Sequence, residues 1–470
     1  MAESKDILLG KLRTGAEMSG REQFKLTLLL AFPSIMAQLS MCLMSYIDAA
    51  MVGRLGSAEA AAIGLVSTST WILGSFCYAN SSGFSVQIAH RCGARDFRGA
   101  SGIFRQGMLT VLMVSLALAL LGISLSGPLP GWLGGSEEIR SDASAYFRIY
   151  SMFLPAYQLA ILCQGSLVAS GNTKIPGITS ISMCVLDVGF NYLFIFKLGM
   201  GVPGAAIGTG LSMLCAGLFL LAYIFSTSRE LGGRRFLTEK DEAGPRRPCD
   251  RREIYRNAFG ITWPLWLQNL VSRGAYIAAT VIVAPLGTIA IAANSFAIIA
   301  EGFCYLPGYG MQDAATALIG QSLGARRRQT ARRFARITIA SGAAMMTFLA
   351  VLMWVFAYGI MGMMSHDPEV IELGAKCLRI EAWAELLYGV SIVAYGCCVG
   401  AGDTLVPSAI NLLSMWVIRL GLALVLIPRM GLLGYWTAMA IELSVKGIIF
   451  AVRIRGGRWM HTRLTEEGAS

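Results

Sequence analysis

Uncharged apolar runs recur along the whole chain, and the first of them, residues 26–47, contains no charged side chain. A run of roughly 20 apolar residues is long enough for one helix to cross the hydrocarbon core of a bilayer. Only 14% of the 470 residues are charged, against about 25% in soluble domains. The sequence therefore predicts an all-α membrane protein with many transmembrane helices.

Basic residues gather in the short polar segments between these apolar runs, and the net charge is +11. The clearest segment is GARRRQTARRFAR near residues 324–336, and others surround Arg234, Arg246 and Arg453. Short loops rich in Lys and Arg face the cytoplasm. We therefore expect an integral, multi-pass protein of the plasma (inner) membrane with both termini in the cytoplasm. The positive charge does not indicate nucleic-acid binding.

The apolar runs give about twelve spans, among them single spans at 142–168 and 372–400. The longest polar stretch, residues 228–256, has the composition of a linker between two six-span halves. The predicted segments are a cytoplasmic N-terminal segment (1–24), an N-lobe (25–227), a cytoplasmic linker (228–256), a C-lobe (257–453) and a cytoplasmic C-terminal tail (454–470).

The two halves repeat each other at a constant offset of 231 residues. Pro33 matches Pro264, Leu55-Gly56 matches Leu286-Gly287, and the Gly-Ala-Arg triplet at 93–95 recurs at 324–326. An even number of spans per half makes such repeats parallel. The sequence predicts twelve transmembrane helices in two six-helix parallel pseudo-symmetric lobes around a central cavity, as in alternating-access transporters. A duplicated receptor or scaffold is an alternative, and so is a channel, although nothing resembles a repeated filter loop.

These motifs resemble the multidrug and toxic compound extrusion (MATE) family. They include YIDAAMVGRLGSAEAAAIG and GFSVQIAHRCGARD in the first half, and APLGTIAIAANSFA and LPGYGMQDAATALIGQSLGA in the second. The resemblance covers roughly residues 25–453. It implies a two-lobed exporter of cationic, lipophilic or aromatic substrates, driven by inward flow of H⁺ or Na⁺. The absence of a GxxxxGK[ST] loop from the sequence agrees with an ion gradient as the energy source.

Four polar residues inside the first-half spans are candidates for ion coupling: Asp48, Asp187, Asn191 and Thr209. Asp187 and Asn191 are four residues apart and so share one helical face. Spans 1, 5 and 6 carry no Lys or Arg at matching depth, so the two carboxylates need a shared proton or a hard cation. The MATE resemblance implies an aspartate at Asp48 and an Asn/Asp pair in span 5, although one branch has these two in the reverse order. Alternatively, Asp48 only reaches the outer membrane interface.

The second-half spans carry four acids and three bases: Glu301, Glu381, Glu385, Glu442, Arg273, Arg419 and Lys446. Glu442 and Lys446 are spaced i,i+4 and predict a structural ion pair. Glu301 and Glu385, with Arg273, are candidates for second-lobe coupling or substrate recognition. Another branch of the MATE family has an acid where this chain has Ser272-Arg273. That branch's second-lobe Na⁺ site is not expected here, because a guanidinium repels Na⁺.

The remaining expectations concern helix shape and partners. Pro33 and Pro264 predict kinks in spans 1 and 7, because proline removes a helical hydrogen bond. The eleven cysteines show no CxxC spacing, so no metal site is expected. We expect a monomer in membrane lipid, without enzyme activity, with no cofactor beyond transported H⁺ or Na⁺, and with organic cations or amphipathic drugs as substrates. The runner-up function is a lipid-linked precursor flippase of a related two-lobed fold.

Overall fold

A computed structural model describes residues 2–232, 250–461 and 464. Within these ranges the chain forms helices and no strand. Much of the predicted linker, including Arg234 and Arg246, and most of the end of the predicted tail lie outside the described residues. Helix α10 begins at Arg251, inside the segment that the sequence assigns to the linker.

Among the described residues, up to eleven spans are long and apolar enough to cross a membrane, and one more helix is long enough to do so. Nine are long and apolar enough to span a membrane alone, and two bent pairs, α6 with α7 and α13 with α14, bring the number to eleven. Helix α17 supplies the twelfth, because its 25 residues extend about 38 Å at 1.5 Å per residue. The predicted fold class, an all-α membrane protein of twelve helices, is confirmed.

One compact unit, unit 2, comprises Met36–Trp266. It contains the end of α2 (Gly20–Gly53), then α3 (Ser57–Gly93), α4 (Phe97–Leu125), α5 (Leu129–Trp132), α6 (Glu137–Met152), α7 (Leu154–Ala169), α8 (Lys174–Asn191), the π-helical η1 (Tyr192–Lys197), α9 (Gly201–Thr227), and the start of α10 (Arg251–Val283). Small residues let these helices approach closely. A Cβ at Gly210 of α9 would lie 2.3 Å from the ring of Phe153.

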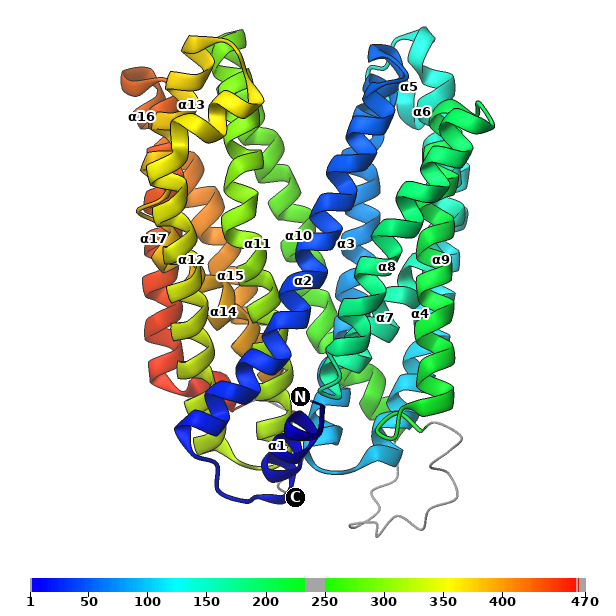
Figure 1. The fold of residues 1–470 in the computed structure, drawn as a ribbon, viewed down its shortest axis with the longest axis vertical. Helices are drawn as coiled ribbons and strands as arrows, with labels where there is room; N and C mark the ends of the chain where they lie inside the picture. Colours follow the sequence, from blue (N-terminus) through cyan, green and yellow to red (C-terminus); the bar gives the residue numbers. More distant parts are fainter. Residues whose placement is uncertain (1, 233–249, 462–463, 465–470) are drawn as a thin grey trace. The chain divides into compact units, whose positions relative to one another are not determined.

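The other compact unit, unit 1, comprises Met1–Ile35 and Leu267–Ser470. It contains α1 (Ala2–Thr14), the start of α2, the end of α10, the 3₁₀ turn η3 (Ala284–Leu286), α11 (Thr288–Gly324), α12 (Arg328–Met364), α13 (Pro368–Glu381), α14 (Glu385–Ala401), α15 (Leu405–Leu413), the π-helical η4 (Ser414–Leu420), α16 (Gly421–Met430), α17 (Leu432–Gly456) and η5 (Arg458–Met460). Helix α1 and η5 lie at the same end of unit 1 (Figure 1), where Leu12, Trp459 and Met460 share one buried cluster.

The division between the units falls inside two continuous helices, after Ile35 in α2 and after Trp266 in α10. These two positions are themselves 231 residues apart. Just before each lies a proline, Pro33 or Pro264, inside its helix. Gly310 of α11 permits a close approach of α2, since a Cβ there would lie 2.5 Å from Cα of Ile35.

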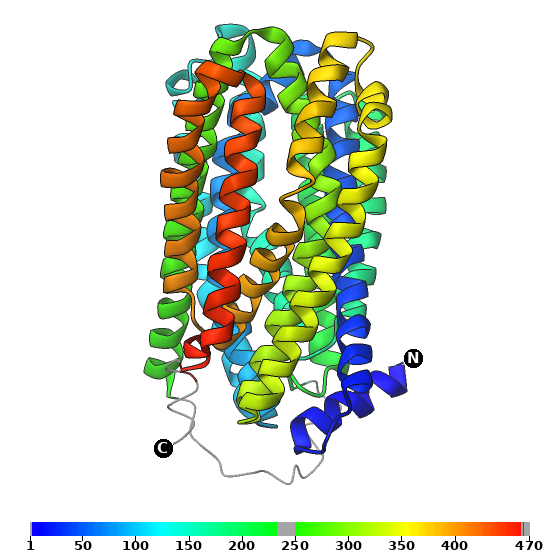
Figure 2. The same cartoon turned by 90° about the vertical axis from the view of Figure 1, so that its left-hand side faces the viewer.

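The sequence repeat is also a repeat of backbone conformation. Arg95 and Arg326, 231 residues apart, both have a positive φ, 61° and 59°, which is uncommon for a residue other than glycine. The bends between α6 and α7 (46°) and between α13 and α14 (58°) fall at matching places in the two halves. The second of these bends can be followed in Figure 2. Each half also has a π-helical segment, η1 or η4, but these two segments do not fall at matching positions.

Candidate ion-binding sites

Helix α8 places two of the predicted residues, Asp187 and Asn191, on one buried face. Both side chains have no exposed surface. Asn191 is the last residue of α8, and the π-helical segment η1 begins at the next residue. Wide π turns occur inside helices mainly at functional sites. The chain therefore carries a local irregularity immediately beside its buried acid–amide pair.

The Asn191 amide joins the two aspartates of the first half. Its Nδ2 donates to Oδ1 of Asp48, from α2, at 2.8 Å and to Oδ2 of Asp187 at 3.0 Å. The hydroxyl of Ser212, from α9, donates to Oδ1 of Asp187 at 3.2 Å. We call these four residues the aspartate site. It lies entirely within unit 2.

Ser212, and not the predicted Thr209, supplies the hydroxyl at the aspartate site. The backbone carbonyl of Thr209 accepts from Ser212 at 2.8 Å, and no hydrogen bond joins the Thr209 side chain to either aspartate in the described part of the chain. The two residues are three apart on α9, so they occupy neighbouring positions on the helix. The sequence indicates the correct helix, α9. Which of its hydroxyl side chains faces Asp187 depends on the orientation of α9 about its axis relative to α8.

The aspartate site has one acceptor atom in excess and no basic partner. Among the described residues, Oδ1 of Asn191 is buried without a hydrogen bond, and no salt bridge joins Asp48 or Asp187 to a Lys or Arg. Gly208 on α9 creates the space for the amide, since a Cβ there would lie 2.1 Å from Oδ1 of Asn191. Two carboxylates, one amide oxygen and one hydroxyl are the donor types that bind a proton or a hard cation.

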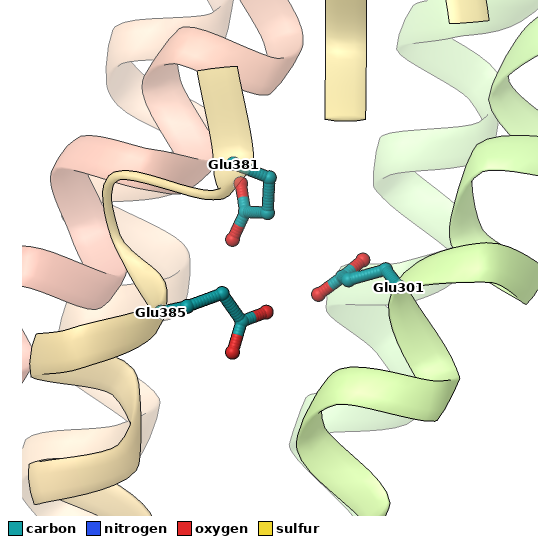
Figure 3. A group of neighbouring side chains, drawn as sticks. All are labelled: Glu301, Glu381 and Glu385. Carbon is teal, nitrogen blue, oxygen red and sulfur yellow. The ribbon is translucent and has the colours of Figure 1, made fainter. Parts of the chain in front are cut away.

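Three buried glutamates form a second group, in unit 1 (Figure 3). Glu301 comes from α11, Glu381 ends α13 and Glu385 begins α14. Each offers a carboxylate oxygen that lies within 4.8 Å of the other two. We call these residues the glutamate cluster. Sequence reasoning singled out Glu301 and Glu385 but not Glu381, because the bend that brings the three together is not visible in the sequence.

Three other second-half charges, Arg419, Lys446 and Glu442, form one buried network. Arg419, on the π-helical η4, donates to Oε2 of Glu442 from Nη2 at 2.7 Å and from Nε at 3.2 Å. Nζ of Lys446 lies 3.2 Å from Oε1 of Glu442, and the Ser414 hydroxyl donates to the same oxygen at 2.7 Å. Glu442 therefore pairs with two cations, and one positive charge of the network stays uncompensated. Arg273 lies on α10, partly buried, within electrostatic range of Tyr309.

The family model described as MatE matches residues 33–193 and 264–425, one copy in each half of the chain. The chain is 27% identical over 435 residues to the probable multidrug resistance protein NorM of Chromobacterium violaceum, covering 89% of this chain and 91% of that protein. It is 28% identical over 445 residues to the protein of the same description from Pseudomonas aeruginosa, covering 91% of this chain and 88% of that protein.

Solved structures agree with this match. A mutant of the Vibrio cholerae MATE transporter VcmN superposes with a TM-score of 0.87 at 19% identity, covering 96% of this chain and all of that chain. A MOP superfamily transporter from Pyrococcus furiosus superposes with a TM-score of 0.84 at 19% identity, covering 95% and 98%. At such identities the likeness establishes the fold alone. Because the family model covers both halves, the chain is a member of the MatE family, the multidrug and toxic compound extrusion family that its motifs resemble.

Proposed function

We propose that the chain is an antiporter that exports organic cations or amphipathic drugs and is driven by inward flow of H⁺ or Na⁺. The observation that carries the proposal is the aspartate site, in which one amide bridges two carboxylates that have no basic partner among the described residues. Family membership supports a transporter, and the curated relatives are described as multidrug resistance proteins.

The aspartate site suits a cycle of ion uptake and release. Without an ion, Asp48 and Asp187 repel each other, and only donors from Asn191 and Ser212 offset the repulsion. A proton or a hard cation removes that repulsion and favours a closer arrangement of α2, α8 and α9. By linkage, a conformation that binds the ion more tightly also changes affinity for the substrate by the reciprocal factor. Ion binding on one side of the membrane then drives substrate release.

The proposal includes the setting of the transporter. We place it in the plasma (inner) membrane as a monomer with both termini in the cytoplasm, on the strength of its basic loop segments. We do not retain the flippase alternative. A lipid-linked pyrophosphate needs accessible cations, whereas Arg419 is buried and bound to Glu442 in this structure.

The proposal is tested by reconstituting the protein in liposomes and imposing Na⁺ and pH gradients separately. We expect a cationic drug to trigger ion movement under one of the two gradients. Asp48→Asn should abolish this coupled movement while the protein remains folded. Asp6→Asn, at a side chain that is 71% exposed on α1, is the matched control and should behave as wild type. Full coupled transport by Asp48→Asn would refute the proposal and leave Asp48 as an interfacial residue.

A further inference from the structure

The glutamate cluster brings together three buried carboxyl groups, two of which have no hydrogen-bond donor among the described residues. The side chains of Glu381 and Glu385 have no exposed surface, and Glu301 is 6% exposed. All four carboxylate oxygens of Glu381 and Glu385 are buried without a hydrogen-bond partner among the described residues. Buried polar groups in native proteins are nearly always paired. Figure 3 shows the three carboxylates directed toward one common space.

We propose that the glutamate cluster is a binding site for one divalent cation of the size of Ca²⁺, held between α11 and the junction of α13 with α14. The site lies in unit 1, away from the residues of the aspartate site. It therefore goes beyond the proposed ion coupling and does not depend on it.

The spacing of the oxygens fits a cation of that size. Oxygens bound to Ca²⁺ lie about 2.3–2.6 Å from the ion, so two of them can be at most about 4.6–5.2 Å apart. The limit of 4.8 Å among the three glutamates lies within this range. Three bidentate carboxylates also offer six oxygens, the lower end of the coordination number of Ca²⁺. Around Mg²⁺, at about 2.0–2.1 Å, two oxygens can be at most about 4.0–4.2 Å apart.

The local charges favour a divalent ion over a monovalent one. Arg419 and Lys446 lie within electrostatic range of Glu301, but both are bound to Glu442. That network of two cations and one carboxylate has a net charge of +1, and the three glutamates have −3 when ionised. A divalent cation brings the sum to zero, whereas Na⁺ leaves one negative charge buried. Buried charge without compensation is costly.

The broken helix supports the same conclusion. Glu381 lies at the carboxyl end of α13, where the helix dipole is negative and favours a cation nearby. Glu381 and Glu385 are four residues apart, a spacing at which like charges destabilise a helix. A shared cation converts this repulsion into a link across the bend of 58°. Cys304, one turn after Glu301, is not a competing ligand, because its Sγ lies 3.6 Å from Sδ of Met353.

The proposal is tested on the full-length protein in detergent by equilibrium dialysis with radioactive Ca²⁺ after removal of metals by a chelator. We expect one Ca²⁺ per chain for wild type, for Asp48→Asn and for the matched control Glu372→Gln, at an exposed glutamate of α13. Glu301→Gln, Glu381→Gln and Glu385→Gln should each weaken Ca²⁺ binding at least ten-fold. Unchanged Ca²⁺ affinity in these three variants, or no Ca²⁺ binding by wild type, would overturn the proposal.

Thermal denaturation provides a second measurement that does not depend on retained activity. Ca²⁺ should raise the Tm of wild type but not that of Glu381→Gln or Glu385→Gln. With chelator present, the two variants should be at least as stable as wild type, because each removes a repelling charge. A Tm increase that Na⁺ or an organic cation produces and Ca²⁺ does not would overturn the divalent assignment. Retained Asp48-dependent transport in Glu381→Gln would separate this site from the proposed coupling site.

Discussion

A single added methyl group at Gly208 should uncouple transport. In Gly208→Ala the new Cβ would lie 2.1 Å from Oδ1, 3.1 Å from Cγ and 3.0 Å from the backbone N of Asn191. Contacts this short force the amide to turn or α8 and α9 to separate. Either movement breaks the hydrogen bonds of 2.8 Å and 3.0 Å through which Asn191 holds Asp48 and Asp187.

The size of the effect follows from these two bonds. A hydrogen bond to a charged group contributes about 1.5–3 kcal/mol, and 1.4 kcal/mol corresponds to a factor of ten in affinity. Because these donors stabilise the ion-free carboxylates, loss of one bond alone should tighten ion binding about ten-fold, and loss of both about a hundred-fold or more, so that the ion is no longer released in the cycle. Overpacking costs a further 1–3 kcal/mol of folding stability, so the Tm should fall by a few degrees.

The assay is drug-triggered ion movement in liposomes, titrated against the driving ion. Gly189→Ala is the matched control, since Gly189 is two residues from Asn191 on α8 and a Cβ there meets nothing within 4 Å. Combining Gly208→Ala with Asn191→Ala should recover part of the lost Tm but not the coupling, because the clash with the amide is gone while the contact of 3.0 Å with the backbone N of residue 191 remains. Wild-type ion dependence in folded Gly208→Ala protein would refute the assigned role of Asn191.

Three further changes test individual contacts. Ser212→Ala removes one hydrogen bond of 3.2 Å from the carboxylate of Asp187, which stabilises the ion-free site, and should tighten ion binding about ten-fold without abolishing transport. An unchanged ion titration would contradict this. Glu442→Gln leaves Arg419 and Lys446 without their shared carboxylate and should lower the free energy of unfolding by about 3–5 kcal/mol. The loss would be measured as a lower Tm or lower expression, and well-folded protein without coupling would contradict a structural role. Glu301→Gln should change transport more than Glu442→Gln does at equal amounts of folded protein, and the reverse order would argue against this ranking.

The sequence predicts the fold well because the fold depends on repeated, local signals. Apolar runs define the spans, and matched motifs define the two halves, down to the positive φ of Arg95 and Arg326 at the same offset. The sequence does not predict the two bends, between α6 and α7 and between α13 and α14. Residues 142–168 and 372–400 read as single spans, and the second bend falls in Glu-Ala-Trp-Ala-Glu, which contains neither proline nor glycine. Only the tertiary environment of α13 and α14 breaks the helix there.

For the candidate sites, the sequence predicts only the contacts that helical periodicity determines within one helix. Asp187 and Asn191 share a face because they are four residues apart, and their lack of basic neighbours is visible in the sequence. The bond from Asn191 to Asp48 joins residues 143 apart, and the choice of Ser212 over Thr209 depends on how α9 packs on α8. Neither contact has a local signature. The same holds for Glu381, whose approach to Glu301 requires the bend.

The 231-residue repeat shows that the two halves carry their buried acids on helices that do not correspond. At the positions that match Glu301 and Glu381, unit 2 has Thr70 and Tyr150, and the Tyr150 hydroxyl donates to the Thr70 carbonyl at 3.2 Å. The two positions that form a neutral hydrogen bond in unit 2 are occupied in unit 1 by two buried acids, and the carboxylate of Glu381 has no hydrogen-bond partner among the described residues. Helices α8 and α9, which carry three of the four residues of the aspartate site, correspond to the helices of unit 1 whose Arg419 and Glu442 neutralise each other. Each unit thus leaves buried acids without a basic partner at one place among its described residues, and the two places do not correspond. An ion site in one half of this duplicated fold is therefore not evidence for an equivalent site in the other, and each has to be tested with its own variants.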